Sequence, residues 1–176
     1  MTQSPGKAGP RRIGRASVWW YPMKASFVLL ALADLALLAT TAAMGLMVSG
    51  TQGFLRHFLL GILSGMFTCF VHIVLYMYFV VQDKIMKQSA MTDGLSSEFV
   101  RQTEGIKLHA FRASMTGIFA ILVAVTLGAS VGILTPAGAH LVAAFAAIAV
   151  NSGAFFYQYA LLDRYSVVFR RAFPEG

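Results

Sequence analysis

Four long apolar stretches, separated by short polar segments, dominate the chain. They run over about residues 25–48, 55–82, 113–134 and 139–162. Each is long enough for a helix that crosses a bilayer, which needs roughly 20 apolar residues. Because the connections 49–54 and 135–138 are short, consecutive helices are expected to run antiparallel. The pattern predicts an all-α membrane protein, a four-transmembrane-helix up-down-up-down bundle with both termini cytoplasmic.

The polar segments divide the rest of the chain. Residues 1–24 carry five basic residues among prolines and glycines, which indicates a flexible basic N-terminal tail. The Trp-Trp-Tyr run at 19–21 is typical of an aromatic anchor at the headgroups. A transmembrane domain then covers 25–164 and includes a cytoplasmic connector of mixed charge at 83–112. Residues 165–176 form a basic C-terminal tail.

The connector contains its own structural signals. Asp93 and Gly94 form a dipeptide typical of a turn. Ser96 is placed to cap a helix, with Glu98 in the first turn, where a negative charge favours the helix N-terminus. We expect a helix to begin there and to enter the membrane as the third span.

Composition and charge agree with a membrane location. The chain has 176 residues, 57% hydrophobic and only 12% charged, whereas soluble domains carry roughly 25% charged residues. Its net charge is +7, and 13 of the 14 Lys and Arg residues fall on one side of the predicted topology, with Arg56 the exception. Such an asymmetry sets orientation and argues against a nucleic-acid partner. We expect a multi-pass protein of the bacterial inner membrane, in contact with anionic lipids.

Small and polar residues recur at helical spacing in the second and fourth spans and indicate packing faces. A faint internal repeat accompanies them, since each of these two spans begins near a His and ends near a Tyr-x-Tyr. The faces consist of His57, Gly61, Gly65, Thr68, His72 and Tyr76 in the second span, and of His140, Ala144, Ala147, Asn151, Phe155 and Gln158 in the fourth.

Three polar residues are expected to form a cluster deep in the membrane. Asp34 lies ten residues from Lys24, and His72 lies eleven residues from Asp83, so both are about 15 Å from the inner edge. Asn151 has a similar depth. A charge at the bilayer centre costs at least about 2.5 kcal/mol, so Asp34 needs a partner inside the bundle. The cluster indicates either a buried hydrogen-bonded group that fixes helix register, or a proton relay or cofactor support.

His57 and His140 form a second candidate site near the outer surface. Both stand at the start of a span and face inward on the packing stripes. Two imidazoles on facing helices, with small residues around them, are what a six-coordinate haem b requires. The alternative is that these histidines contact lipid phosphate or a partner subunit.

The other histidines do not complete a second haem site. In di-haem four-helix cytochromes b, each of two helices carries two histidines about four turns apart. His72 follows His57 by fifteen residues, but Phe155 stands where the fourth span would need its second ligand. His109 lies too near the inner rim. We therefore predict at most one haem, and the single cysteine, Cys69, is expected to be an inert buried thiol.

Three functions are compatible with these features. The first is a non-enzymatic accessory subunit of a larger membrane complex, such as a respiratory or electron-transfer assembly, bound to other membrane subunits or to itself. The second is a b-type cytochrome that passes electrons between quinol and a partner. The third is a small proton or ion transporter that uses Asp34 and His72. The sequence contains no specific catalytic motif and no metal-ligand spacing, which argues against an enzyme.

Overall fold

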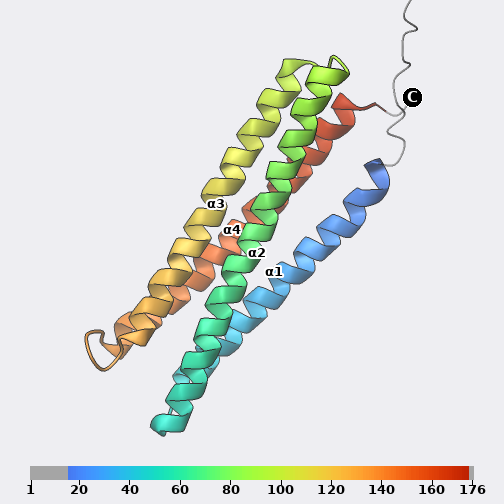
Figure 1. Cartoon of the computed structure of the whole chain (residues 1–176). Helices are drawn as coiled ribbons and strands as arrows, with labels where there is room; N and C mark the ends of the chain where they lie inside the picture. The colour runs from blue at the N-terminus through green and yellow to red at the C-terminus, as the bar shows by residue number, and fades with distance from the viewer. Residues whose placement is uncertain (1–15, 175–176) are drawn as a thin grey trace, which may run out of the picture.

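The structure is a computed structural model that describes residues 16–174, and side chains from residue 23 onward. Over this range the chain forms four α-helices, α1 (Ala16–Leu46), α2 (Gly50–Thr92), α3 (Ser97–Ala129) and α4 (Ala137–Ala172). Figure 1 shows them as one elongated bundle. The expected all-α, four-helix fold is confirmed.

All four helices are long and apolar enough to cross a membrane. Each contains an 18-residue window with a mean hydropathy between 1.7 and 2.2 and few charged residues. Most apolar side chains in these windows face outward, where lipid covers them. The chain is therefore a multi-pass integral membrane protein.

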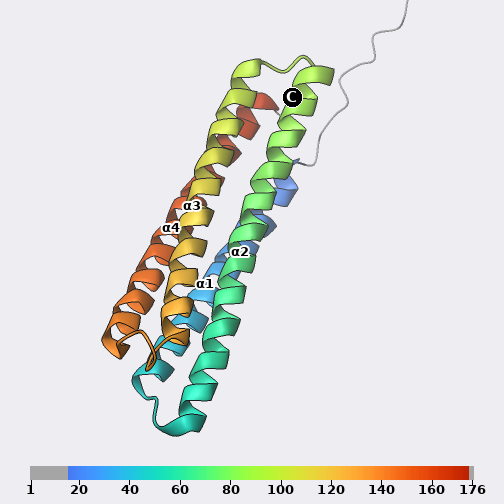
Figure 2. The ribbon, with the colours of Figure 1, turned by 60° about the vertical axis from the view of Figure 1, so that its left-hand side comes forward.

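The helices pack in a ring, each against its two neighbours. α1 contacts α2, α2 contacts α3, α3 contacts α4, and α4 returns to α1, while the backbones of the diagonal pairs α1–α3 and α2–α4 stay apart and only their side chains meet. The start of α1, the α2–α3 turn and the end of α4 lie at one end of the bundle (Figures 1 and 2). By the charge asymmetry of the sequence this is the cytoplasmic end. Residues on α2 and α4 can therefore approach each other only across the centre of the bundle.

The helices extend beyond the predicted spans at the cytoplasmic end. α2 continues ten residues past Gln82 and ends at Thr92, so most of the predicted connector is helical. The turn at Gly94, with φ +69°, and the cap at Ser96 are confirmed. The Ser96 hydroxyl accepts a hydrogen bond of 3.3 Å from the backbone N–H of Glu98.

The termini of the bundle also differ in detail from the predicted boundaries. α1 already begins at Ala16, and α4 continues to Ala172. Residues 16–24 of the predicted N-terminal tail (1–24) and residues 165–172 of the predicted C-terminal tail are therefore helical. Residues 1–15 and the aromatic side chains at 19–21 lie outside what the structure describes. α3 ends at Ala129, five residues before the predicted end of the third span, because a turn around Gly132, with φ +82°, follows it.

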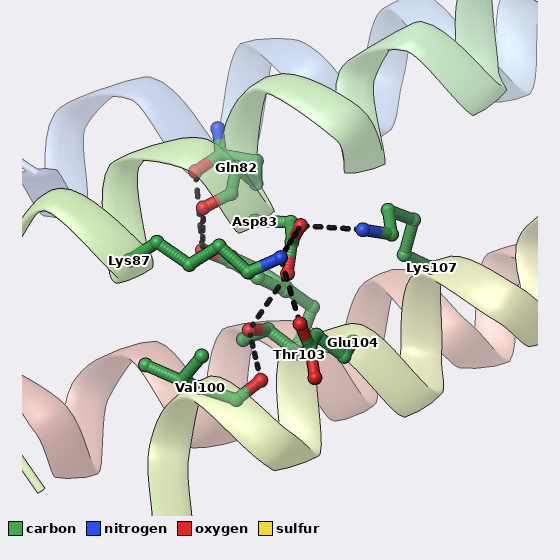
Figure 3. A network of polar contacts seen from close by, with 8 residues as sticks. Gln82, Asp83, Lys87, Val100, Thr103, Glu104 and Lys107 are labelled. Atoms are coloured by element: carbon green, nitrogen blue, oxygen red, sulfur yellow. Dashed lines mark hydrogen bonds and ion pairs between the residues drawn. The ribbon is translucent and has the colours of Figure 1, made fainter. Parts of the chain in front are cut away.

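A buried carboxylate joins α2 to α3 where they leave the membrane (Figure 3). Asp83 is 4% exposed and accepts from the Lys107 ammonium at 2.5 Å and from Lys87 at 3.1 Å. Lys87 also pairs with Glu104 on α3 at 2.7 Å. The Thr103 hydroxyl donates to Asp83 at 3.5 Å. These contacts fix the register of α2 against α3 outside the apolar layer.

Side-chain size differs between the two halves of the bundle. The cytoplasmic half has a core of large residues that includes Phe79, Met86, Leu161 and Tyr165. The outer half has a smaller cluster formed by Leu38, Ile121, Ala124 and Ala147. Large side chains fill the space between helices, whereas alanine and glycine do not, and so the outer half retains room for a cavity.

Candidate functional site

His72 lies at the centre of a closed polar network between α2, α3 and α4. Its Nε2 is 2.8 Å from Oδ1 of Asn151, and its Nδ1 is 3.2 Å from Nε2 of Gln158. The Gln158 amide also donates to the Ser114 hydroxyl at 2.9 Å. All four residues have 0% exposure. Three helices are thus joined by hydrogen bonds at membrane depth, where an unpaired polar group is costly.

The network fixes the protonation state of the ring. Nδ2 of Asn151 donates to the carbonyl of Ala147 at 2.8 Å and to that of Gly117 at 3.4 Å, so its Oδ1 must face His72. Nε2 of His72 therefore carries the proton, and Nδ1 accepts from Gln158. A neutral imidazole gives both ring nitrogens a partner, while Oε1 of Gln158 is buried without one. Gly117 makes the arrangement possible, because a methyl group there would overlap the His72 ring.

Phe155 occupies the position in which a second haem ligand would be needed. Its ring stacks on His72 with centroids 4.8 Å apart and an angle of 19° between the planes. Since both nitrogens of His72 are hydrogen-bonded and its face is covered, this level of the bundle is fully packed. Neither ring nitrogen of His72 is therefore left free for a ligand.

Asp34 is hydrogen-bonded to Thr68 and not to His72, the partner that the sequence suggested. Its Oδ1 accepts a 2.8 Å hydrogen bond from Thr68, one turn before His72 on α2. Its Oδ2 is buried and has no hydrogen-bond partner. The structure thus joins His72 to Asn151, while Asp34 is held by Thr68 beside that network. Sequence reasoning did not identify Ser114 or Gly117, although their spacing on one face of α3 could have shown them.

His57 and His140 face each other across the outer half of the bundle. Their ring centroids are 6.0 Å apart and the rings are inclined by 63°. They belong to α2 and α4, whose backbones do not approach each other, so the two imidazoles meet across the centre of the bundle. Nδ1 of each ring is buried without a hydrogen-bond partner. Two adjacent half-buried imidazoles, each with a buried and unpartnered Nδ1, are unusual and point to a missing ligand.

Each of these histidines packs against a glycine of the preceding helix. A methyl group on Gly45 would lie 2.8 Å from Cε1 of His57, and one on Gly128 would lie 2.7 Å from Cε1 of His140. Glycine stands twelve residues before histidine in both hairpins. This spacing strengthens the faint repeat between the two halves, and sequence reasoning missed the role of Gly45.

A cavity of about 480 Å³ surrounds the two histidines. All four helices line it, with mostly small or apolar residues such as Ala42, Gly61, Ala124 and Ala144. Polar groups are few, and include the Thr41 and Ser64 hydroxyls, which are 2.6 Å apart. The size and the apolar walls with a few convergent polar groups match a small-molecule or cofactor site.

The remaining candidate ligands lie outside this cavity. His109 is exposed and its Nδ1 is 3.0 Å from the Tyr157 hydroxyl. Cys69 is a half-buried free thiol. Among the described residues no group of three or more His, Cys, Asp and Glu side chains could hold a metal ion. The histidine pair is therefore the arrangement with the clearest potential for ligand binding.

Comparisons of the chain with protein-family models, with curated proteins and with solved structures find no match.

Proposed function

We propose that the chain is a membrane-embedded b-type cytochrome, in which His57 and His140 are the axial ligands of a single haem. The observation that carries the proposal is the separation of the two imidazole centroids, 6.0 Å. A metal–imidazole bond is about 2 Å, which puts each ring centroid about 3 Å from the metal. Two imidazoles on opposite sides of one iron would therefore have centroids about 6 Å apart.

The surroundings of the pair support the same proposal. Four-helix bundles hold cofactors through side chains on facing helices, and His57 and His140 come from the diagonal pair α2 and α4. The cavity of about 480 Å³ is apolar, as a porphyrin requires. Iron would also satisfy a nitrogen on each ring, which a purely structural role leaves unexplained.

Arg56 places a positive charge directly before His57 in the sequence. It is the one basic residue on the outer side of the predicted topology, it is exposed, and it precedes His57 directly. Haem carries two propionate groups, and a guanidinium is well suited to pair with a carboxylate. We propose that the propionates face the outer surface, near Arg56.

A haem with two protein ligands exchanges single electrons and leaves no open position for substrate. The chain would thus pass electrons between quinol in the bilayer and a partner, and would fit within a larger electron-transfer complex of the bacterial inner membrane. The accessory-subunit hypothesis becomes a special case, in which this subunit carries a haem. A transporter is less well supported, since the described helices have no break at membrane depth.

The test is a reduced-minus-oxidised visible spectrum of the protein purified in mild detergent and titrated with hemin. We expect a b-type spectrum with one haem per chain. His57→Ala and His140→Ala should each lose the six-coordinate signal. His109→Gln is the matched control, because His109 lies outside the cavity, and its spectrum should be unchanged.

Circular dichroism and size-exclusion chromatography would establish that each variant is folded. A folded wild-type protein that binds no hemin would disprove the proposal. A six-coordinate spectrum that persists in both alanine variants would also disprove it, since the ligands would then lie elsewhere.

A further inference from the structure

Asp34 is buried in the membrane-spanning part of the bundle with half of its carboxyl group unpaired. It has 0% exposure. Thr68 supplies one hydrogen bond to Oδ1, and Oδ2 has no partner. A fully ionised carboxylate in this environment calls for at least two donors or a cation. The structure provides a single donor, which suits a neutral carboxylic acid better than a carboxylate.

No cation pairs with Asp34 on the side of α2. The nearest titratable groups there are Cys69, which follows Thr68, and His72, whose two ring nitrogens bond to other residues. Within the described residues Asp34 takes part in no ion pair. Its charge is therefore uncompensated on this side.

The side of α4 is equally free of compensating charge. Asp163 lies at the cytoplasmic edge, where it pairs with Lys24 of α1. His140 lies at the outer end of α4, in the cavity. Between these ends α4 meets α1 through apolar side chains such as Phe155, which contacts Phe27. The backbones of α3 and α1 do not approach each other, and their side chains meet in the apolar cluster of Leu38, Ile121 and Ala124.

Asp34 lies directly beneath the cavity of the histidine pair. Leu38 of α1 and Ser64 of α2 line the cavity, Asp34 is one turn before Leu38, and Thr68 is one turn after Ser64. Asp34 is eleven residues from Gly45, against which the His57 ring packs, or about 16 Å along the helix. Charges at this distance in a poorly polar interior still interact, because no solvent screens them.

We infer that Asp34 is a redox-linked proton-binding site, which takes up one proton when iron held between His57 and His140 is reduced and releases it on oxidation. The inference rests on the proposed haem. With haem bound, one electron from a hydroquinone-class donor, which releases a proton as it is oxidised, would add one negative charge between His57 and His140, and the Asp34 carboxylate would take up one proton to become a carboxylic acid. The net charge of the interior is then unchanged. The Ser64 hydroxyl, one turn before Thr68 on α2, lines the cavity and lies 2.6 Å from the Thr41 hydroxyl.

The experiment is a redox titration of hemin-loaded protein over a range of pH, with dithionite and ferricyanide. The wild-type midpoint potential should fall as pH rises, toward about 59 mV for each tenfold change in proton concentration. Asp34→Asn cannot bind the proton, and its midpoint should be independent of pH over the same range. Cys69→Ala is the control for the nearest other titratable group and should behave as wild type.

An infrared difference spectrum of the wild type provides a second readout that needs no variant to fold. Reduction should produce a carbonyl band of a protonated carboxylic acid, shifted in heavy water. Thr68→Val should move this band, since it removes the only hydrogen bond to the carboxyl group. A slope retained in Asp34→Asn, or the absence of both slope and band in the wild type, would overturn the inference and leave the haem proposal intact. A protein without haem would overturn both.

Discussion

At the scale of single residues, the histidine pair depends on two glycines. The Gly45 and Gly128 positions are in contact with the rings of His57 and His140, and the space that a methyl group would need is already taken by carbon atoms of the imidazoles. The absence of a side chain at these positions lets each ring lie flat against the preceding helix. The same principle operates at Gly117, beside the His72 ring. Glycine here provides space for rings, which is a packing role.

Gly128→Ala should therefore impair haem binding. The added methyl group would lie 2.7 Å from Cε1 of His140, so the ring must move. Overpacking of this kind costs about 1–3 kcal/mol of stability, and we expect a weakened or altered six-coordinate spectrum with at least tenfold weaker hemin binding. Gly153→Ala on α4, the helix that carries His140, is the control, because nothing lies within 4 Å of the added methyl group. It should bind hemin normally. Equal hemin affinity in the two variants would argue against this packing role.

At the scale of the elements, α2 and α3 are held together by polar contacts after they leave the apolar layer. Burial of Asp83 between two helices leaves its charge dependent on Lys87 and Lys107. Figure 3 shows that the lysines approach Asp83 from both helices. Apolar side chains cannot set the register as sharply at this point, because the membrane ends near here and the surface becomes polar.

Asp83→Asn should lower the stability of the bundle by about 1–3 kcal/mol, since it removes hydrogen bonds from a buried charged group. Thermal unfolding in detergent measures the loss. Glu98→Gln is the control, because the Glu98–Arg101 pair is exposed and such pairs contribute less than about 1 kcal/mol. The two variants should unfold at clearly different temperatures, and a smaller effect of Asp83→Asn would show that apolar packing alone sets the register.

At the scale of the whole molecule, the bundle is asymmetric along its axis. The cytoplasmic half is filled by large side chains and by the His72 network, while the outer half is built from glycine, alanine and a few larger residues around a cavity. Unfilled space between helices lowers stability, because the atoms that line it lose contacts. We expect the bundle to gain stability when a ligand occupies this space.

Hemin should accordingly raise the unfolding temperature of the wild-type protein. At a free concentration 100 times the dissociation constant, binding adds about 2.7 kcal/mol, which for a chain of this length corresponds to about 5–11 °C. His140→Ala should show no such shift, and His109→Gln should show all of it. A shift that survives in His140→Ala would indicate that hemin binds outside the cavity.

The order of residues was enough to predict the four helices, their antiparallel order, the turn at Gly94 and the cap at Ser96, because hydrophobicity and turn chemistry act locally along the chain. It also placed His57 and His140 at equal depth, since depth follows from counting residues from the membrane edge. The sequence also predicted that no second haem ligand faces His72, because Phe155 stands where the fourth span would need a histidine.

Only the tertiary structure decided which side chains meet. Each helix can rotate about its axis without changing its depth, and this rotation joins Asp34 to Thr68, and His72 to Asn151 and Gln158. Likewise the cavity exists because small residues from all four helices converge at one level. Such features depend on the volumes left between helices that are distant in sequence, and no local pattern of residues encodes them.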